Sequence, residues 1–184
     1  MCAGDMKIPA PYRIRKARAD EFERLQEVER RAARMFAEVG LGGITDDDAT
    51  ALEDFAHCHE HGLLWVAADE SDRPVGFAFV EMADRQPHLD EIDVDPDHSR
   101  RGLGRAMVEA VAEWARQGGY RSLTLTTFRD VPWNMPFYAR LGFQVLPAAE
   151  QGPELRALVD AETRRGLPVE LRVVMRRALR SSAQ

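Results

Sequence analysis

The segment 94–106, VDPDHSRRGLGRA, places Gly102 and Gly104 in the first turn of an expected helix, directly after an expected strand. The first amide groups of a helix have no partner within it and lie at the positive end of its dipole. Glycine leaves these amides open to an anion, so the segment predicts a phosphate-binding loop. Three arginines would add positive charge: Arg100, Arg101 and Arg105.

Three other interpretations of this segment compete with the phosphate loop. A dinucleotide fingerprint needs Gly or Ala at its sixth position, where Met107 stands, and it is expected near the start of a βαβ unit. A P-loop needs Gly-Lys-Ser/Thr, which does not follow Gly104. The third is that the glycines only allow the helix to pack closely.

An acidic strand precedes the loop and could supply a general base. Asp90, Glu91 and Asp93 lie close together, and strand alternation places Glu91 and Asp93 on one face and Ile92 and Val94 on the other. Neighbouring carboxylates raise one another's pKa and attract a cationic amine. The alternative is a solvated strand face, which suits Asp90 best.

Size and composition indicate one globular domain. The chain has 184 residues and a net charge of −6, and 45% of its residues are hydrophobic. Mild acidity disfavours nucleic acid and anionic membranes as partners. Cys2 and Cys58 cannot form a disulfide framework, and neither a secretory segment nor a run of ~18 apolar residues is present. We therefore expect a cytoplasmic protein.

Hydrophobic periodicity and turn signals predict a mixed sheet of seven strands flanked by five helices. The glycines at 40, 42 and 43 are expected to break the first helix. The predicted strands are 12–16, 63–68, 75–82, 89–94, 122–128, 143–146 and 170–175. The predicted helices are 19–37, 46–61, 103–117, 134–140 and 153–164.

Two motifs carry a resemblance to a known family. The loop, read as Val-x-Pro-x-x-x-Arg-Arg-Gly-Leu-Gly-x-Ala-Met, resembles the acetyl-CoA pyrophosphate loop of the GNAT superfamily of N-acetyltransferases. The segment 134–143, NMPFYARLGF, resembles the second signature of that family. The likeness covers about residues 12–178 and is strongest from 89 to 143. Ser99 departs from the pattern, because the family usually carries Gln or Arg there.

The resemblance implies a single GNAT domain over residues 1–184, with an ordered core of about 12–178 and a mostly antiparallel sheet of about seven strands. Two splayed parallel strands would hold the co-substrate acetyl-CoA, with no metal. The pantetheine arm would pair with the backbone of Ile92, Asp93 and Val94. The residues expected at the pyrophosphate are Ser99, Arg100, Arg101, Gly102, Leu103, Gly104 and Arg105.

The second signature implies a general acid. Tyr138 matches the family tyrosine that protonates the leaving thiolate, and an ordinary tyrosine is protonated at neutral pH. The alternative is a half-buried aromatic side chain. Asn134 either contacts the cofactor, caps the helix that follows, or does both. Glu91 is the preferred base or water-holder, and Asp93 is the second candidate.

The implied reaction is direct transfer of an acetyl group from acetyl-CoA to a primary amine in a ternary complex. Two alternatives are a non-catalytic acyl-CoA sensor and an NAD-binding module. We expect a small-molecule amine rather than a protein as acceptor, and no nucleic acid or membrane partner. The oligomeric state is left open, and a homodimer is the arrangement common in the family. Phe128 and Trp133 would line the acceptor groove or belong to the core.

The segment His57-Cys58-His59-Glu60-His61 could suggest a metal site, because His57 and His61 lie four residues apart on a helix. No second His/Cys pair lies near in sequence, so we expect a polar helix end instead. Neither cysteine lies in a signature, which disfavours an acetyl-enzyme and favours direct transfer.

Overall fold

The computed structural model describes residues 8–37, 49–131, 133–164 and 169–179. No helix among them is long and apolar enough to cross a membrane. The strands are β1 Arg13–Lys16, β2 Leu64–Ala68, β3 Pro74–Ala83, β4 Gln86–Val94, β5 Ser122–Phe128, β6 Gln144–Val145 and β7 Arg172–Ala178. The helices are α1 Phe22–Ala37, α2 Leu52–Glu60, α3 Leu103–Gln117, α4 Met135–Arg140 and α5 Pro153–Arg164. Short 3-10 turns are η1 Ala19–Glu21, η3 Pro96–His98, η4 Ala148–Glu150 and η5 Val169–Leu171.

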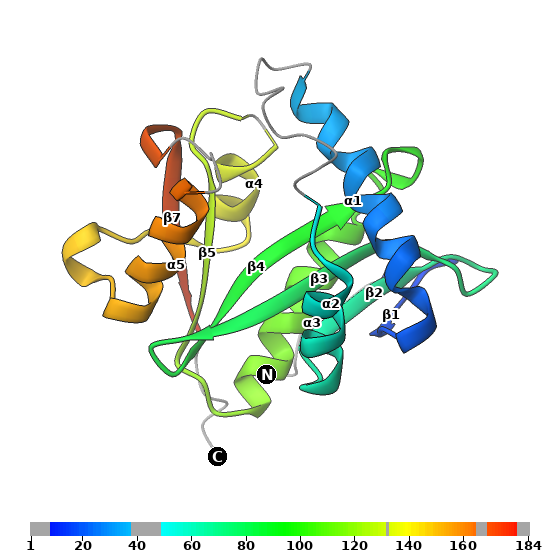
Figure 1. Ribbon diagram of the computed structural model, residues 1–184, viewed down its shortest axis with the longest axis horizontal. Coiled ribbons are helices and arrows are strands. Elements are labelled where there is room, and N and C mark those ends of the chain that lie inside the picture. The colour runs from blue at the N-terminus through cyan, green and yellow to red at the C-terminus, as the bar shows by residue number, and fades with distance from the viewer. Residues whose placement is uncertain (1–7, 38–48, 132, 165–168, 180–184) are drawn as a thin grey trace. The chain divides into compact units, whose positions relative to one another are not determined.

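The described strands form a seven-stranded mixed sheet in the order β1-β2-β3-β4-β5-β7-β6 (Figure 1). β2 pairs antiparallel with β1 and β3, and β7 pairs antiparallel with β5 and β6. β4 and β5 are parallel, with His88 opposite Thr124 and Leu89 opposite Leu125. The predicted fold class, a mixed and mostly antiparallel sheet flanked by helices, is confirmed.

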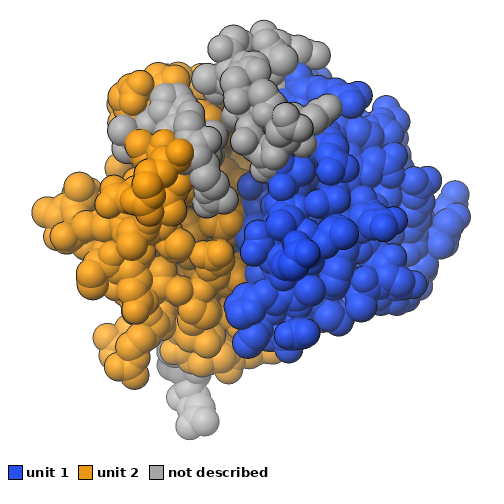
Figure 2. Space-filling view, viewed as in Figure 1, with its two compact units in different colours: residues 1–79, 91–113 blue, residues 80–90, 114–184 orange. Residues whose placement is uncertain are grey.

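The chain divides into two compact units (Figure 2). Unit 1 comprises Met1–Phe79 and Glu91–Glu113, and unit 2 comprises Val80–Asp90 and Trp114–Gln184. β3 and β4 each pass from one unit to the other.

Unit 1 has an apolar core on one face of β2 and β3. Phe77 on β3 points into this core, so Gly76 before it points to the opposite face. A Cβ on Gly76 would lie 2.8 Å from the Asp93 carbonyl oxygen and 3.2 Å from Met107 of α3, so β3 and β4 approach closely only because residue 76 is glycine. The core members are Ala17, Leu25, Val28, Phe55, Cys58, Leu64, Val66, Phe77 and Phe79.

Unit 2 begins with the β3–β4 hairpin. Its two turn residues, Asp84 and Arg85, both have positive φ angles (50° and 62°), as a tight two-residue hairpin requires. The Asp84 carboxylate accepts hydrogen bonds from the amides of Glu154 (3.1 Å) and Leu155 (3.0 Å), and so it caps α5. A small apolar cluster lies under α5: Ala83, Leu146, Leu155, Leu158, Val159 and Val174.

Lys16 lies at the end of β1 on an aromatic ring. Its ammonium nitrogen is 3.0 Å from the centre of the Trp65 ring and donates to the Gly62 carbonyl oxygen. Burial lowers the pKa of Lys16 to about 8.

Most predicted elements agree with the structure, and the disagreements have physical causes. β4 starts at Gln86 rather than residue 89, because the hairpin turn fixes its first residue. The predicted strand 170–175 is wrong at both ends: η5 occupies 169–171, and β7 matches the full length of its partner β5. The glycine break at 40–43 lies outside the described residues, and so do residues 46–48. The predicted helix 46–61 nevertheless starts too early, because residues 49–51 are not helical and α2 begins at Leu52.

Replacing Phe55 by Ala should lower the free energy of unfolding by about 3–5 kcal/mol, because the Phe55 ring is fully buried. The centre of this ring lies 5.3 Å from that of Phe77 and 6.0 Å from that of Phe79. Urea denaturation measures the loss. Leu52→Ala on the same helix is the control, because Leu52 is 37% exposed, and it should stay within about 0.5 kcal/mol of the wild type. Equal losses in the two variants would contradict this placement of the core.

Candidate active site

The predicted phosphate loop is anchored by a buried carboxylate at its first residue, Asp95, which is 1% exposed. One carboxylate oxygen accepts from Arg24 at 2.8 Å, and the other accepts from the Asp97 amide at 3.1 Å and pairs with Arg31 at 3.2 Å. Its own amide donates to the Val75 carbonyl oxygen at 2.8 Å. Asp95 thus ties the end of β4 to α1 and to the loop.

Two opposing effects set the ionisation of Asp95. Burial raises the pKa of a carboxyl, but the hydrogen bonds from Arg24 and the Asp97 amide, with the charge of Arg31, leave the pKa of Asp95 below its ordinary value. The Asp95 carboxylate is therefore charged at neutral pH. This anchor is absent from the sequence-based prediction. Its signals are the Asp-Pro start of η3 and the spacing of seven residues between Arg24 and Arg31, which puts both on one face of α1.

The first glycine of the predicted loop has a backbone conformation that favours glycine. Gly102 has a φ of +82°, and a Cβ built there would point into open space. Arg100 also has a positive φ of 58°. The Ala106 amide donates to the Gly102 carbonyl oxygen at 3.0 Å, so the amides of residues 103–105 belong to the first turn of α3. This backbone fits a phosphate group.

Arg101 has structural partners within the loop. Its guanidinium donates to the Tyr12 hydroxyl at 2.7 Å and to the Asp97 carbonyl oxygen at 3.0 Å. The same hydroxyl lies 3.0 Å from Nδ1 of His98. Arg101 therefore fastens the loop to the segment before β1. Arg100 and Arg105 are exposed, and a role for all three at phosphate stays a prediction.

The acidic strand places its carboxylates in different surroundings. Burial and the nearby charge of Glu29 on α1 raise the pKa of Asp93 to about 8. Val94 points the other way, because one of its methyl groups lies 3.3 Å from the position of a Cβ on Gly76. The alternation predicted for Asp93 and Val94 is thus present. Glu91 and Ile92 are half-buried.

The second signature lies in unit 2 and forms α4. Tyr138 is 9% exposed, and its ring packs edge-on against those of Phe137 (5.0 Å) and Phe143 (5.9 Å). Asn134 occupies the position before α4, but its side chain makes no capping hydrogen bond. Its carbonyl oxygen instead accepts from the Phe137 and Tyr138 amides at 2.8 and 3.1 Å. The prediction that the Asn134 side chain caps this helix is wrong.

Phe128 and Trp133 differ in burial. Phe128 is 4% exposed, and the Arg172 guanidinium lies 5.0 Å from the centre of its ring, as expected for a core residue. Trp133 is 37% exposed, so it is not a core residue. A role in lining the acceptor groove stays a prediction for both.

The histidines of α2 form a polar helix end. His57 and His61 are exposed, with ring centres 4.4 Å apart, and Nδ1 of His61 lies 2.8 Å from the His57 carbonyl oxygen. Cys58 between them is 4% exposed in the core of unit 1, which does not favour a reactive thiol.

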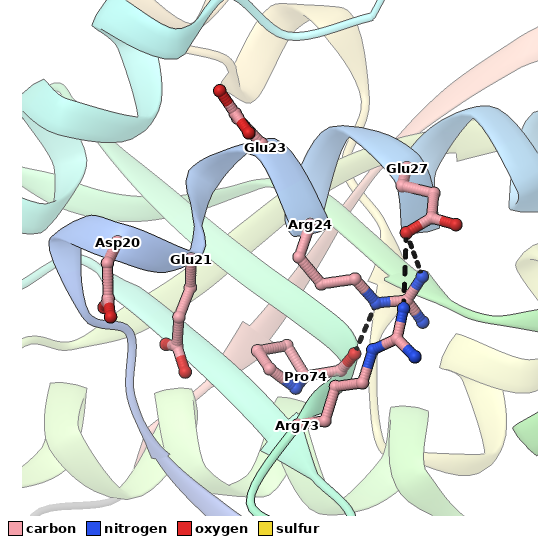
Figure 3. Close-up of a pocket in the computed structure, with 7 residues that line it drawn as sticks. All are labelled: Asp20, Glu21, Glu23, Arg24, Glu27, Arg73 and Pro74. Carbon is pink, nitrogen blue, oxygen red and sulfur yellow. Dashed lines mark hydrogen bonds and ion pairs between the residues drawn. The ribbon is translucent and has the colours of Figure 1, made fainter.

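Unit 1 also has a surface hollow of about 490 Å³ beside the start of α1 (Figure 3). Arg24 and Arg73 both point to the Glu27 carboxylate, at 2.5 and 3.6 Å, and the Arg24 Nε donates to the Pro74 carbonyl oxygen at 2.9 Å. Both arginines of the hollow therefore pair with the Glu27 carboxylate. The lining residues are Asp20, Glu21, Glu23, Arg24, Glu27, Arg73 and Pro74, and none was predicted as a site residue.

The predicted site residues fall into two groups. Unit 1 brings together the end of β4, from Glu91 to Val94, and the loop from Ser99 to Arg105. Unit 2 carries Phe128, Trp133, Asn134 and Tyr138. The order of these segments along the chain is the order expected for an acetyltransferase.

Comparison with known proteins decides the family. Residues 22–143 match the model of the acetyltransferase (GNAT) family. The chain belongs to this family. This GNAT protein is therefore an acyltransferase, and the family match includes both the loop and the second signature.

Relatives and solved structures agree with this assignment. The GNAT chain is 29% identical over 138 residues to the peptidyl-lysine N-acetyltransferase YjaB of Escherichia coli, covering 74% of this chain and 85% of the relative. It is 29% identical to the mycothiol acetyltransferase of Propionibacterium freudenreichii, covering 77% of this chain and 46% of the relative. A GNAT acetyltransferase from Staphylococcus aureus shares the fold with a TM-score of 0.70 at 17% identity, covering 92% and 99% of the two chains. The PaiA N-acetyltransferase of Thermoplasma acidophilum, solved with coenzyme A, gives a TM-score of 0.64 at 14% identity, covering 91% and 98%.

Asp93 should make this acetyltransferase less stable as the pH rises from about 4 to 8. The unfolded chain loses the Asp93 proton near pH 3.8, whereas the folded chain keeps it up to about pH 8. The folded state binds more protons in this window, so a rise in pH favours unfolding.

Asp93→Asn, which resembles the protonated acid, should remove this contribution. Denaturation at pH 5 and pH 8 should show the variant gaining about 3–4 kcal/mol over the wild type at the higher pH. Asp54→Asn is the control, because Asp54 is exposed on α2. A constant difference between Asp93→Asn and the wild type at the two pH values would argue against the raised pKa.

Proposed function

We propose that this protein transfers the acetyl group of acetyl-CoA to a primary amine, directly and within a ternary complex. The observation that carries the proposal is the loop at the start of α3, where Gly102 has a φ of +82° and leaves the first amides of the helix open. Those amides offer hydrogen bonds to a pyrophosphate, and the helix dipole adds to the attraction. Holding both substrates together supplies much of the rate.

Similar proteins support an amine acceptor and a CoA donor. The relatives of this chain include proteins named peptidyl-lysine N-acetyltransferase and mycothiol acetyltransferase, and structural neighbours were solved with coenzyme A. We infer that the acceptor is a small molecule, that the protein is cytoplasmic, and that the whole chain acts as one acetyltransferase domain.

We assign Tyr138 as the general acid. A thiolate leaves when the acetyl group moves to the amine, and a proton from the phenol would neutralise it. The aromatic rings of Phe137 and Phe143 hold the Tyr138 ring in one orientation, which favours a defined proton donor. Asn134 is assigned to the cofactor, since its side chain has no capping role.

Glu91 is the better candidate for the base or water-holder. Asp93 has a pKa of about 8, so it is mostly protonated at neutral pH and cannot accept a proton there. Glu91 lies two residues before it on the same strand and is half-buried.

Gly102→Ala should weaken acetyl-CoA binding by at least about tenfold, because the new methyl group enters the space that the phosphate needs and strains a positive φ. Isothermal titration with acetyl-CoA measures the change in Kd. Gly119→Ala is a matched control, since Gly119 also has a positive φ (+76°) with open space, beyond the other end of α3. The loop would lose its assigned role if both variants bound acetyl-CoA equally well.

Tyr138→Phe should lower kcat by about 10²–10⁴-fold and leave the Kd of acetyl-CoA nearly unchanged, because only the departing thiolate needs the proton. The measurement is the steady-state release of CoA with primary amines as acceptors. A decrease of less than about threefold would remove Tyr138 from the chemistry. Tight acetyl-CoA binding without turnover over a broad panel of primary amines would contradict the transferase and favour an acyl-CoA sensor.

A further inference from the structure

Unit 2 contains a histidine that the roles assigned above leave unused. His88 on β4 is fully buried, and its Nδ1 lies 2.9 Å from the Thr124 hydroxyl oxygen. Its Nε2 is buried without a hydrogen-bond partner. A buried polar atom of this kind destabilises the fold unless something bonds to it, so it points to a ligand.

The protonation of His88 follows from its neighbours. We assign the hydrogen of His88 to Nδ1, because the Thr124 hydroxyl has a single proton, and this proton can go to the Pro87 carbonyl oxygen at 3.4 Å. Nε2 therefore keeps its lone pair. Burial and the positive charge of Arg172 lower the pKa of His88 to about 4, so the ring is neutral at neutral pH. His88 thus presents a hydrogen-bond acceptor.

Two carboxylates lie next to this acceptor. His88, Asp90 and Glu162 each contribute one nitrogen or oxygen atom, and no two of these atoms are more than 4.8 Å apart. Asp90 follows His88 on β4, whereas Glu162 comes from α5. Because these three atoms are at most 4.8 Å apart, a single atom placed between them can lie within about 2.8 Å of all three. This distance is the ordinary length of a charge-assisted hydrogen bond.

We propose that His88, Asp90 and Glu162 bind the primary ammonium group of the acceptor. The inference rests on the proposed function and names the site where the amine is received. A primary ammonium has three N–H groups, and the cluster offers three acceptor atoms for them. Secondary and quaternary amines have fewer N–H groups and would leave an acceptor unfilled.

The charges of the cluster favour an ammonium group over a divalent metal. The Arg172 guanidinium lies 3.0 Å from the Glu162 carboxylate, so a positive charge already borders this cluster. This guanidinium repels a divalent ion about twice as strongly as a singly charged ammonium group, and the repulsion is screened least in a buried setting.

The burial of the three residues also limits the shape of the acceptor. His88 and Glu162 are 0% and 5% exposed, whereas Asp90 is half-buried. The ammonium group therefore enters from the side of Asp90, with its carbon chain directed back toward solvent. We therefore expect the acceptors to be primary amines on an unbranched carbon.

The test is nuclear magnetic resonance of the full chain with ¹⁵N-labelled histidine side chains, titrated with butylammonium. His88→Gln identifies the His88 signals, and His57→Gln, at an exposed position on α2, is the matched control. We expect butylammonium to shift the His88 Nε2 signal saturably and trimethylbutylammonium, which has no N–H group, to leave it unchanged. Asp90→Asn should weaken the butylammonium response about tenfold, whereas His57→Gln should not.

Two results of the titration would overturn the inference. One is an equal His88 response to the two ammonium ions, and the other is one-to-one binding of Zn²⁺ that is lost in His88→Gln. Kinetics give an independent measurement in the half-buried variant Asp90→Asn, where the KM of a primary amine should rise about tenfold or more while the Kd of acetyl-CoA stays the same.

These results separate the inference from the proposed function. Acetyl transfer with an unchanged amine KM in Asp90→Asn refutes the ammonium site and leaves the transferase intact. Butylammonium binding at His88 without acetylation of any amine refutes the transferase and supports the ammonium site.

Discussion

The buried carboxylate of Asp95 is the contact on which the loop depends. Removing a charge from water is costly, and here two guanidinium groups and a backbone amide compensate for it. Asp95 directly follows β4 and is the first residue of the loop. Its contacts with Arg24 and Arg31 therefore fix both the end of the strand and the start of the loop that leads to α3. A loop held in this way is organised before a phosphate arrives, which reduces the cost of binding.

Local signals predicted most of the fold. The bounds of β5 and α5 agree with the sequence-based ranges, because β-branched residues and helix-start signals stand next to the elements that they define. β7 was misplaced because its length depends on pairing with β5, more than forty residues earlier, rather than on its own sequence. Register set by a distant strand cannot be read from a local window.

The candidate site divides in the same way. The glycines of the loop and the place of Tyr138 within α4 followed from motifs. The ion partners of Asp95, the contact between Arg101 and Tyr12, and the raised pKa of Asp93 all depend on segments far apart in sequence. Nothing near residue 88 in the sequence indicates that Glu162 meets His88. Contacts between residues that are distant in sequence depend on tertiary packing, and local sequence patterns do not predict them.

The scarcity of lysine affects how this protein would tolerate acetyl-CoA, its proposed donor. Thioesters acetylate neutral amines without a catalyst, and Lys7 and Lys16 are the only lysines in the chain, against 25 lysines and arginines together. Arginine stays charged and does not compete for the acetyl group. The lowered pKa of Lys16 makes it the more reactive amine in principle, but the Trp65 ring and the Gly62 carbonyl oxygen hold its nitrogen and restrict attack. Acetylation of side-chain amines is therefore limited to two positions, so it can add at most two acetyl groups to the intact mass during storage with acetyl-CoA.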